Sequence, residues 1–377
     1  MPLRAFVDGK EVIAPALSDE EWEALRQRVQ DEKLSVVLPC CDREGYLRRS
    51  RLGTRHFAHK HSTDDAAPQC EMAGETIQHL KAKADIVKAA LRAGYRAAPE
   101  IPGAGWRADV MASRPDGSGR IAFEVQWSFL RLEDCMFRQE RYARDDVRGC
   151  WFFRNPPPQW IRDGDIGPEL KARRELPLFH LWVNADLTFS VSLNRKLYNL
   201  DDFVYALLKS QIRFCAAARA RRRQKLRFAF VEIPCERCGR NTSIYHVDTR
   251  LAARCGMTFI PEESWYSDTF AFHPQVQAAA SRIAENNTWT RMGAIRPRTS
   301  EREKETYLSF GCAHCDAMLD RSYVEMTLYG TRRLEEAYET DGYEVEVTFE
   351  KSPSARVPHW CYAPKGGFCC GAHQRSS

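Results

Sequence analysis

The chain has 377 residues, of which 44% are hydrophobic and 28% charged, and its formal net charge is +5. This composition is typical of a globular protein with room for two or three domains. No window approaches the roughly 18 uninterrupted apolar residues of a membrane span, and the N-terminus lacks the apolar core of a secretory signal. We therefore expect a cytosolic protein without a membrane segment.

The cysteines and the basic residues both suggest binding partners. In a reducing compartment, the 14 cysteines are expected to be metal ligands or buried thiols rather than disulfides. Basic residues cluster at 48–61 and at 219–227, a run that includes Arg221, Arg222 and Arg223. Such clusters favour phosphate-rich partners such as DNA, although a charged run is also typical of a solvated helix face.

Residues 1–70 form the first predicted region. Ser18 and Glu21 have the spacing of a capping box and predict a helix through about Lys33, and a strand follows in "LSVVLP". From residue 40 to residue 70 apolar periodicity is weak, so we expect a small module held by a metal ion rather than by a core. Its candidate zinc ligands, with His56 and His61 as alternative histidines, are Cys40, Cys41, His59 and Cys70.

Residues 71–200 predict an α-β-β-β-α-β order of elements. The segment "GETIQHLKAKADIVKAALRAG" has apolar residues at three- and four-residue steps, which predicts a helix that ends at Gly94. Extended runs around 95–101, 106–113 and 120–128 follow, and then a charged helix in "RLEDCMFRQERYARDD". Further strands are predicted in "CWFFRN" and in "LPLFHLWVNADLTFSVSL".

Two acids occupy neighbouring strands of a predicted hairpin. Asp116-Gly117 is the strongest signal for a two-residue type I′ turn, and this turn would set Asp109 opposite Glu124 on one face, with Gln126 beside them. Two carboxylates so close repel each other unless a cation lies between them, and Mg²⁺ or Mn²⁺ is the natural occupant. A longer loop would shift the register by one residue and break this pairing.

The preceding helix adds three polar residues at four-residue spacing. Glu75, His79 and Lys83 therefore share one flank of the helix. Glu-to-Lys spacing of this kind is common on solvated faces. Combined with the two acids of the hairpin, however, it favours a catalytic site that includes all three residues.

The remaining sequence predicts a basic helix and a zinc-binding C-terminal domain. We expect a helix and linker over 201–230, ending in the arginine run, and a zinc-ribbon-like domain over 231–377. The four ligands of its structural Zn²⁺ come from two Cys-x-x-Cys turns, namely Cys235, Cys238, Cys312 and Cys315. The residues between the turns, 239–311, are long for a zinc ribbon and predict an insertion.

These motifs resemble a known family. "HFAH", "ETIQHLKAK", "RADV" and "FEVQWS" are similar to the competence protein CoiA-like family within the PD-(D/E)XK nuclease superfamily, and "FRQERYARDDVRGCWFF" extends the likeness. The resemblance implies an α/β fold with a restriction-endonuclease-like core, a mixed sheet flanked by helices, to which this chain adds zinc-binding N-terminal and C-terminal modules.

The resemblance also implies roles for individual residues. Asp109 and Glu124 would hold one or two divalent metal ions, and Glu75 would assist. Gln126 stands where the family carries a lysine, so the missing positive charge must come from elsewhere, with Lys83 as the first candidate and Arg141 as the second. Arg138 and Arg141 are further candidates for contact with nucleic acid.

Three functions are compatible with these observations. The leading one is a metal-dependent nuclease acting on DNA, in DNA uptake and recombination or in defence against foreign DNA. The second is a catalytically inactive nucleic-acid-binding or adaptor protein on a nuclease fold. The third is a zinc-ribbon scaffold that recruits a protein partner through its C-terminal domain.

Overall fold

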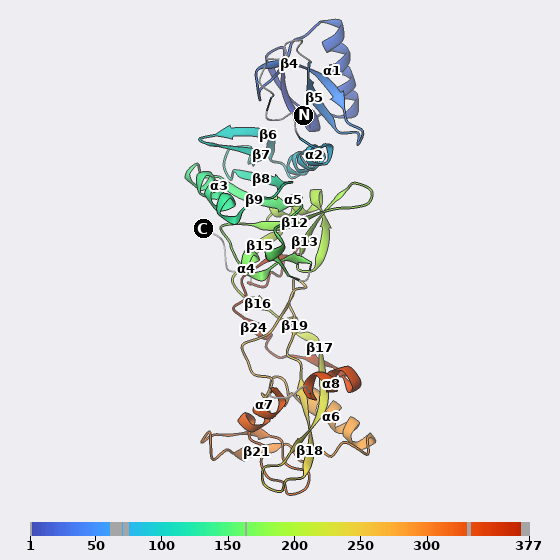
Figure 1. Ribbon diagram of the computed structural model, residues 1–377, viewed down its shortest axis with the longest axis vertical. Helices are drawn as coiled ribbons and strands as arrows, with labels where there is room; N and C mark the ends of the chain where they lie inside the picture. Colours follow the sequence, from blue (N-terminus) through green and yellow to red (C-terminus); the bar gives the residue numbers. More distant parts are fainter. Residues whose placement is uncertain (1, 61–69, 71–74, 163, 330–332, 371–377) are drawn as a thin grey trace. The chain divides into compact units, whose positions relative to one another are not determined.

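The computed structural model describes residues 2–60, 70, 75–162, 164–329 and 333–370 (Figure 1). The chain folds as two compact units: unit 1 is Met1–Cys215 with Pro358–Phe368, and unit 2 is Ala216–Val357 with Cys369–Ser377. Unit 1 thus contains both the N-terminal region and the nuclease-like region expected from the sequence. Within the described ranges, no helix is long and apolar enough to span a bilayer.

The N-terminal part of unit 1 is a five-stranded sheet with the order β2-β1-β3-β4-β5. The capping box of Ser18 and Glu21 opens helix α1 (Asp19–Asp31) as expected, and Trp22 of this helix packs edge-on against the buried ring of Phe57. The expectation that residues 40–70 lack a core is therefore wrong for the described residues. The strands are β1 (Arg4–Val7), β2 (Lys10–Ile13), β3 (Val36–Leu38), β4 (Arg43–Arg49) and β5 (Arg55–His59), and a 3-10 turn spans Ala14–Ala16.

A seven-stranded mixed sheet forms the centre of unit 1, in the order β14-β13-β12-β9-β8-β7-β6. Strands β8, β9 and β12 run parallel to one another, whereas the other neighbouring pairs are antiparallel. The strands are β6 (Arg96–Gly103), β7 (Trp106–Ser113), β8 (Ile121–Gln126), β9 (Arg148–Phe153), β12 (Leu178–Val183), β13 (Phe189–Leu193) and β14 (Lys196–Asn199). The segment expected as one strand from residue 176 to residue 193 is thus the hairpin β12–β13.

Helices cover both faces of this sheet and confirm the predicted fold class. Helices α2 (Ile77–Arg92) and α5 (Leu200–Leu208) share one apolar core with the sheet. Helices α3 (Leu132–Arg144) and α4 (Pro168–Lys171) share a second core with the opposite face. A short hairpin beside α4 consists of β10 (Ile161–Arg162) and β11 (Asp165–Ile166), preceded by a 3-10 turn at Pro158–Trp160.

The hairpin β7–β8 has the predicted register but a different turn. Val110 pairs with Phe123 and Ala112 with Ile121, which is the register expected from Asp116-Gly117. The predicted type I′ turn is wrong, because a longer loop joins the strands and Gly117, not Asp116, has a positive φ, at 83°. The Gly117 N–H donates to the carbonyl of Arg114, so an ordinary turn precedes the glycine.

The predicted basic helix after residue 200 is mostly extended chain. Helix α5 ends at Leu208 and is followed by Ser210, whose φ is 56°. The strands that follow are β15 (Ile212–Cys215), β16 (Ala218–Arg219) and β17 (Arg223–Pro234). In β17, Leu226 and Phe228 are buried at a spacing of two residues, a strand pattern that the arginine run concealed. Strand β25 (His359–Tyr362) returns late in the chain to pair with β15.

Unit 2 is built on the three-stranded antiparallel sheet β18-β17-β23. Strand β18 (Asn241–Val247), at the start of the stretch 239–311 expected as an insertion, belongs to this sheet and pairs with β17. The other elements are β19 (Leu251–Ala252), β20 (Thr258–Phe259), α6 (Pro274–Asn286), β21 (Arg296–Thr299), β22 (Thr306–Ser309), α7 (Arg321–Tyr329), α8 (Arg333–Asp341), β23 (Tyr343–Thr348) and β24 (Ser354–Ala355).

Candidate functional site

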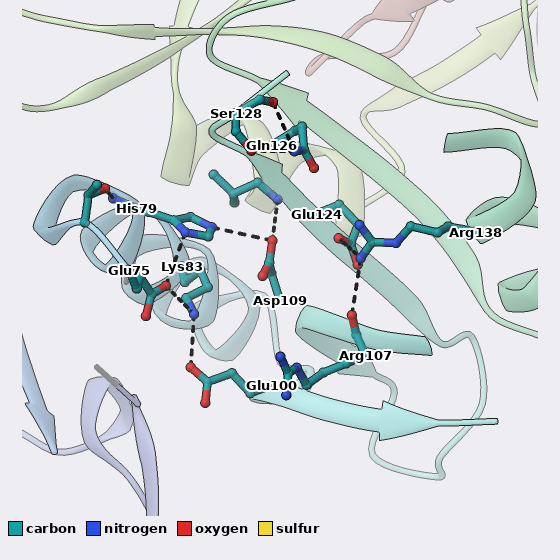
Figure 2. A network of polar contacts seen from close by, with 12 residues as sticks. Glu75, His79, Lys83, Glu100, Arg107, Asp109, Glu124, Gln126, Ser128 and Arg138 are labelled. Atoms are coloured by element: carbon teal, nitrogen blue, oxygen red, sulfur yellow. Dashed lines mark hydrogen bonds and ion pairs between the residues drawn. The ribbon is translucent and has the colours of Figure 1, made fainter. Parts of the chain in front are cut away.

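A buried lysine connects helix α2 to strand β6. The side chain of Lys83 is completely buried, and its Nζ lies 2.5 Å from Glu75 Oε1 and 3.0 Å from Glu100 Oε1 (Figure 2). Burial alone would lower the pKa of Lys83, but the charges of Glu100 and Glu75 outweigh this effect and raise it. Lys83 therefore stays charged and neutralises carboxylates inside the protein.

The two glutamates come from distorted or terminal positions of their elements. Glu75 precedes Thr76, the N-cap residue of α2, and burial raises its pKa against the lowering effect of Lys83 and His79. Glu100 has a φ of 58° in the middle of β6, where the flanking residues Pro99 and Ile101 keep their ladder pairs. Glu100 has this unusual backbone conformation at a position where its side chain is 5% exposed and accepts a hydrogen bond from Lys83.

His79 links this network to Asp109. Its Nδ1 lies 3.3 Å from Glu75 Oε1, and its Nε2 lies 3.6 Å from Asp109 Oδ2. The Val125 N–H donates to the same Asp109 oxygen at 2.8 Å, and the ring of Trp127 stacks against the imidazole. Burial would raise the pKa of Asp109, but the interactions with His79 and with the Lys83 charge lower it below its ordinary value. Asp109 is therefore ionised.

Glu124 belongs to a second network on helix α3. The Tyr142 hydroxyl donates to one of its carboxylate oxygens, and Arg138 Nη2 donates to the other at 2.6 Å. Glu124 is 1% exposed. Burial and the neighbouring charge of Asp109 raise its pKa to about 8, although Arg138 and Tyr142 act in the opposite direction. An ionised Glu124 is thus costly in this arrangement unless further positive charge is near.

The two acids do not face each other as the hairpin argument predicted. The ladder between β7 and β8 ends at Val110 and Phe123, and the Asp109 carboxylate takes the next N–H of β8, that of Val125. Asp109 then turns to His79 on α2, and Glu124 turns to α3 on the opposite face of the sheet (Figure 2). The predicted arrangement of both acids on one face is therefore wrong. The charge of Asp109 nevertheless raises the pKa of Glu124.

Lys83 does not replace the lysine that the family carries at the position of Gln126. Gln126, at the end of β8, donates from Nε2 to the Ser128 carbonyl at 3.0 Å. A completely buried Lys83 cannot touch a substrate phosphate, and exposed Arg141 donates to the Gly105 carbonyl at 2.7 Å. The cation in contact with a candidate metal ligand is Arg138, which the sequence suggested only as a contact to nucleic acid.

Three contributors to these networks were missed or misassigned. Arg138 and Tyr142 are four residues apart on α3, and that spacing indicates a shared flank, so their convergence on one acid could have been considered. Glu100 gave no comparable signal, because it lies between prolines in an apolar run and its role depends on a local backbone distortion.

The arginine run has partners within unit 2. Arg222 donates to the carbonyls of Phe349 and Glu350, and Arg223 forms a 2.5 Å ion pair with Glu346 on β23. Arg221 is exposed. The predicted role of these arginines in binding nucleic acid stays a prediction.

The N-terminal cysteines and one histidine gather into a cluster that could hold a metal ion. The ligand atoms of Cys40, Cys41, His59 and Cys70 lie within 4.8 Å of one another. Cys41 Sγ is 3.2 Å from His59 Nε2, and the sulfurs of Cys40 and Cys41 are 3.8 Å apart. Four thiolate and imidazole ligands at such separations suit tetrahedral coordination, and the adjacent cysteines both contribute.

The C-terminal cluster is built from two equivalent turns. Cys235, Cys238, Cys312 and Cys315 gather within 4.8 Å. In each turn the first cysteine accepts at its carbonyl from the residue four positions later, Gly239 or Asp316, and both of these residues have a positive φ. The sulfur pairs Cys235–Cys315 and Cys238–Cys312 are each 3.7 Å apart, close to the ~3.8 Å edge of a tetrahedron with Zn–S bonds of ~2.3 Å.

Within this cluster the surroundings of Cys312 favour its thiolate, whereas burial raises the pKa of Cys235 to about 11. Burial would raise the pKa of Cys312, but hydrogen bonds from the backbone N–H groups of His314 and Cys315 lower it to about 6. The His314 ring, inside the second turn, bonds with the Asn241 carbonyl at 3.0 Å. Cys135, Cys150 and Cys215, which lie outside this cluster, are buried.

Comparison with known proteins confirms the family resemblance over part of the chain. The family model described as "Competence protein CoiA, nuclease-like domain" matches residues 75–160, the segment that carries both polar networks. No curated protein matches the chain. The solved structure of SfsA from Pyrococcus furiosus in complex with Ca²⁺ is similar at 15% identity and a TM-score of 0.22, over 45% of this chain and 86% of that one.

Replacing Lys83 with methionine should destabilise unit 1 by about 3 kcal/mol, because it leaves two buried carboxylates without their cation. Lys81→Met is the matched control on the same helix: Lys81 is partly exposed and pairs with Asp85 at 2.6 Å, so its loss should cost at most about 1 kcal/mol. Urea unfolding monitored by tryptophan fluorescence compares the two. Equal stability of both variants would contradict the assignment.

The stability difference between Glu124→Gln and the wild type should depend on pH. Because folding raises the pKa of Glu124 from 4.5 to about 8, the wild type loses stability as pH rises through this window, while the variant has no proton to lose. Glu124→Gln should match the wild type near pH 5 and exceed it by roughly 2 to 4 kcal/mol at pH 8.5. Unfolding curves without added divalent metal test this, and a pH-independent difference would contradict the raised pKa.

Replacing Cys238 with serine should remove about one bound metal ion per chain, because four thiolates form one tetrahedral site. Cys150→Ala is the control, since Cys150 is a buried thiol outside the metal clusters. Metal content measured by atomic emission should fall for the first variant and not for the second. An unchanged content in Cys238→Ser would exclude a metal at this cluster.

Proposed function

We propose, from the premise that residues 75–160 form a CoiA-type nuclease-like domain, that this chain is a metal-dependent nuclease that hydrolyses phosphodiester bonds in DNA. The observation that carries the proposal is the pair of acids on the adjoining strands β7 and β8, partly exposed Asp109 and buried Glu124. Each is oriented by its own helix-borne network, as catalytic groups require.

Three observations support a divalent cation at this pair. Glu124 has a pKa of about 8 partly because Asp109 is charged, and a cation would relieve that repulsion. Asp109 keeps about a quarter of its side chain exposed. Among the described residues, His79 Nε2 is a buried nitrogen without a hydrogen bond, and it faces Asp109. Oxygen ligands with one imidazole suit Mg²⁺ or, better, Mn²⁺.

The metal ion would act as a Lewis acid on the phosphate and lower the pKa of a bound water. The protein groups would prepare this site. Glu75 holds the imidazole of His79 by contact with its Nδ1, and Lys83 keeps Asp109 ionised through its buried charge. Gln126 can orient a water or a phosphate oxygen with its amide, but it supplies no charge.

Arg138 is our candidate for the positive charge that the missing lysine would supply. Its guanidinium already touches Glu124 and is about one-third exposed, so it can reach both the acid and an incoming phosphate. Arginine donates through a planar fork that matches phosphate oxygens. Its position on α3 therefore supports a direct role in holding substrate.

The two Cys/His clusters support structural zinc in both modules. Their ligand types and spacing match tetrahedral Zn²⁺ sites, which stabilise small folds. Thiolate ligation favours a reducing compartment, in agreement with a cytoplasmic protein. Within the cell, the nuclease would act in DNA uptake and recombination or in defence against foreign DNA, and unit 2 would recruit a protein partner.

A second candidate function is binding of nucleic acid without cleavage. It is favoured by Gln126 and by the engagement of both Glu124 oxygens with Arg138 and Tyr142. In such a protein the ion pair would permanently replace the metal. The Glu124–Arg138 contact would then stabilise the fold and not a reaction.

Cleavage of single- and double-stranded DNA and of RNA with Mg²⁺ or Mn²⁺ distinguishes these functions. The wild type should cleave DNA, and Asp109→Asn and Glu124→Gln should each lose roughly 100-fold or more in rate, because each removes a metal ligand. Glu133→Gln, an exposed acid on α3, is the matched control and should keep full activity.

Two results would contradict the nuclease proposal. Binding of DNA with no cleavage under any metal condition would favour the second function. Equal cleavage by the wild type and by Glu124→Gln would show that the activity does not arise from this site.

A further inference from the structure

The parallel strands of the central sheet end at one edge, next to the candidate site. Strands β8, β9 and β12 are neighbours and finish at Gln126, Phe153 and Val183 (Figure 1). Ligands of open α/β sheets bind outside the carboxyl ends of such strands. The residues at this edge are therefore placed to contact a substrate that extends beyond Gln126.

Exposed aromatic side chains lie near this edge, and a basic side chain lies beside one of them. Phe129, in the loop after β8, is 63% exposed, and Trp182, near the end of β12, is 40% exposed. Exposed Arg195 lines the same hollow as Trp182, whereas Arg154, just after β9, stacks on Trp127 on the opposite face of the sheet, 4.6 Å from its ring centre. Exposed aromatic rings interleaved with arginine are the elements of single-stranded nucleic-acid binding, in which rings stack on bases and arginines contact phosphates.

Trp182 borders an open hollow of about 720 Å³. The other lining residues are Gly164, Asp165, Ser192, Arg195 and Leu197. The ring of His180 packs against the indole of Trp182 with ring centres 4.3 Å apart and planes tilted by 36°. Arg195 and exposed Leu197 complete a wall that is apolar with a basic rim. This combination suits a flat, apolar ring on a phosphate backbone.

The strand register fixes how far this hollow is from the candidate site. Gln126 pairs with Phe153, and Phe153 pairs with His180, so His180 is two strands away in the same cross-strand row. At ~4.8 Å per strand this separation is ~10 Å. Trp182 lies on the same face as His180, two residues further along β12. A few nucleotides of an extended strand span such a distance.

We infer that the face of the central sheet beside the hollow at Trp182 binds single-stranded nucleic acid, with an unpaired base stacked on Trp182 and phosphates beside Arg195. This inference rests on the proposal that the chain acts on nucleic acid, and it adds the form of the substrate. An unpaired base is required because a base inside a duplex presents no free face to the indole. Stacking is tolerant of sequence, so this face selects single strands and not a base sequence.

Binding to a base-bearing and an abasic oligonucleotide of equal length and charge tests the inference. Fluorescence anisotropy is measured in the Glu124→Gln background, in which cleavage does not interfere. The protein should prefer the base-bearing strand, and Trp182→Ala should reduce that preference by roughly 5- to 100-fold, the range expected for one stacked base. Trp182→Phe should retain most of it, because a smaller ring still stacks.

The matched control is Trp289→Ala, which removes a tryptophan of similar exposure in unit 2 and should leave the preference unchanged. Both Trp182 variants should keep the salt dependence of binding, because phosphate contacts remain. An unchanged preference in Trp182→Ala, or equal binding of both strands by the parent protein, would overturn the inference.

The outcome is separable from that of the nuclease proposal. Metal-dependent cleavage by the wild type without any effect of Trp182 would leave the nuclease and remove the stacking site. Preference for the base-bearing strand that depends on Trp182, without cleavage, would support the binding face and reject the enzyme. Failure to bind either strand would reject the binding site for single strands, and the cleavage assay on double-stranded DNA would decide the nuclease proposal separately.

Discussion

The ammonium group of Lys83, enclosed by the carboxylates of Glu75 and Glu100, is the interaction around which unit 1 is organised. A charge this deep is tolerated only with partners at hydrogen-bonding distance, so helix α2 and strand β6 cannot shift relative to each other without exposing an unpaired ion. The Nδ1 atom of His79 contacts Glu75, and its Nε2 atom lies beside the carboxylate of Asp109. The position of Asp109, the first candidate metal ligand, therefore depends on the packing of α2 on the sheet. A movement of that helix would displace the Asp109 carboxylate.

Elements defined by local periodicity could be predicted from the sequence. The apolar spacing of α2, the capping box of α1 and the register of β7 with β8 depend on residues close together in the chain. The long helix predicted after residue 200 was wrong beyond Leu208. The charges of the arginine run concealed the two-residue apolar alternation that is typical of a strand, here β17. Pairing of β15 with β25 depends on residues far apart in sequence, for which periodicity carries no information.

The candidate site could be predicted in its membership but not in its orientation. The sequence motifs and the residue spacing were sufficient to identify four members of the site, namely Glu75, His79, Asp109 and Glu124. Which face a side chain adopts depends on where a ladder ends. The pairing of β7 with β8 ends at Val110, and the preceding residue, Asp109, turns to α2. The bond between Arg138 and Glu124 joins two elements whose relative rotation the sequence does not state. The metal clusters were easier to predict, because few residue types bind zinc and their ligand atoms must lie close together. The cluster expected in the N-terminal region is present as Cys40, Cys41, His59 and Cys70.

The pairing of β25 with β15 also determines when unit 1 can finish folding. Residues 358–368 belong to unit 1, although the whole of 216–357 intervenes in the chain. During synthesis the ribosome must therefore make unit 2 before the last strand of unit 1 exists, and until then the edge of β15 stays open to other strands. A fragment that stops after residue 215 would carry this unsealed edge permanently. The two units are thus interleaved along the chain rather than arranged in tandem, because the chain returns to unit 1 at 358–368 and then enters unit 2 again. The last strand of unit 1 can pair only if unit 2, most of which is made earlier, does not block its approach.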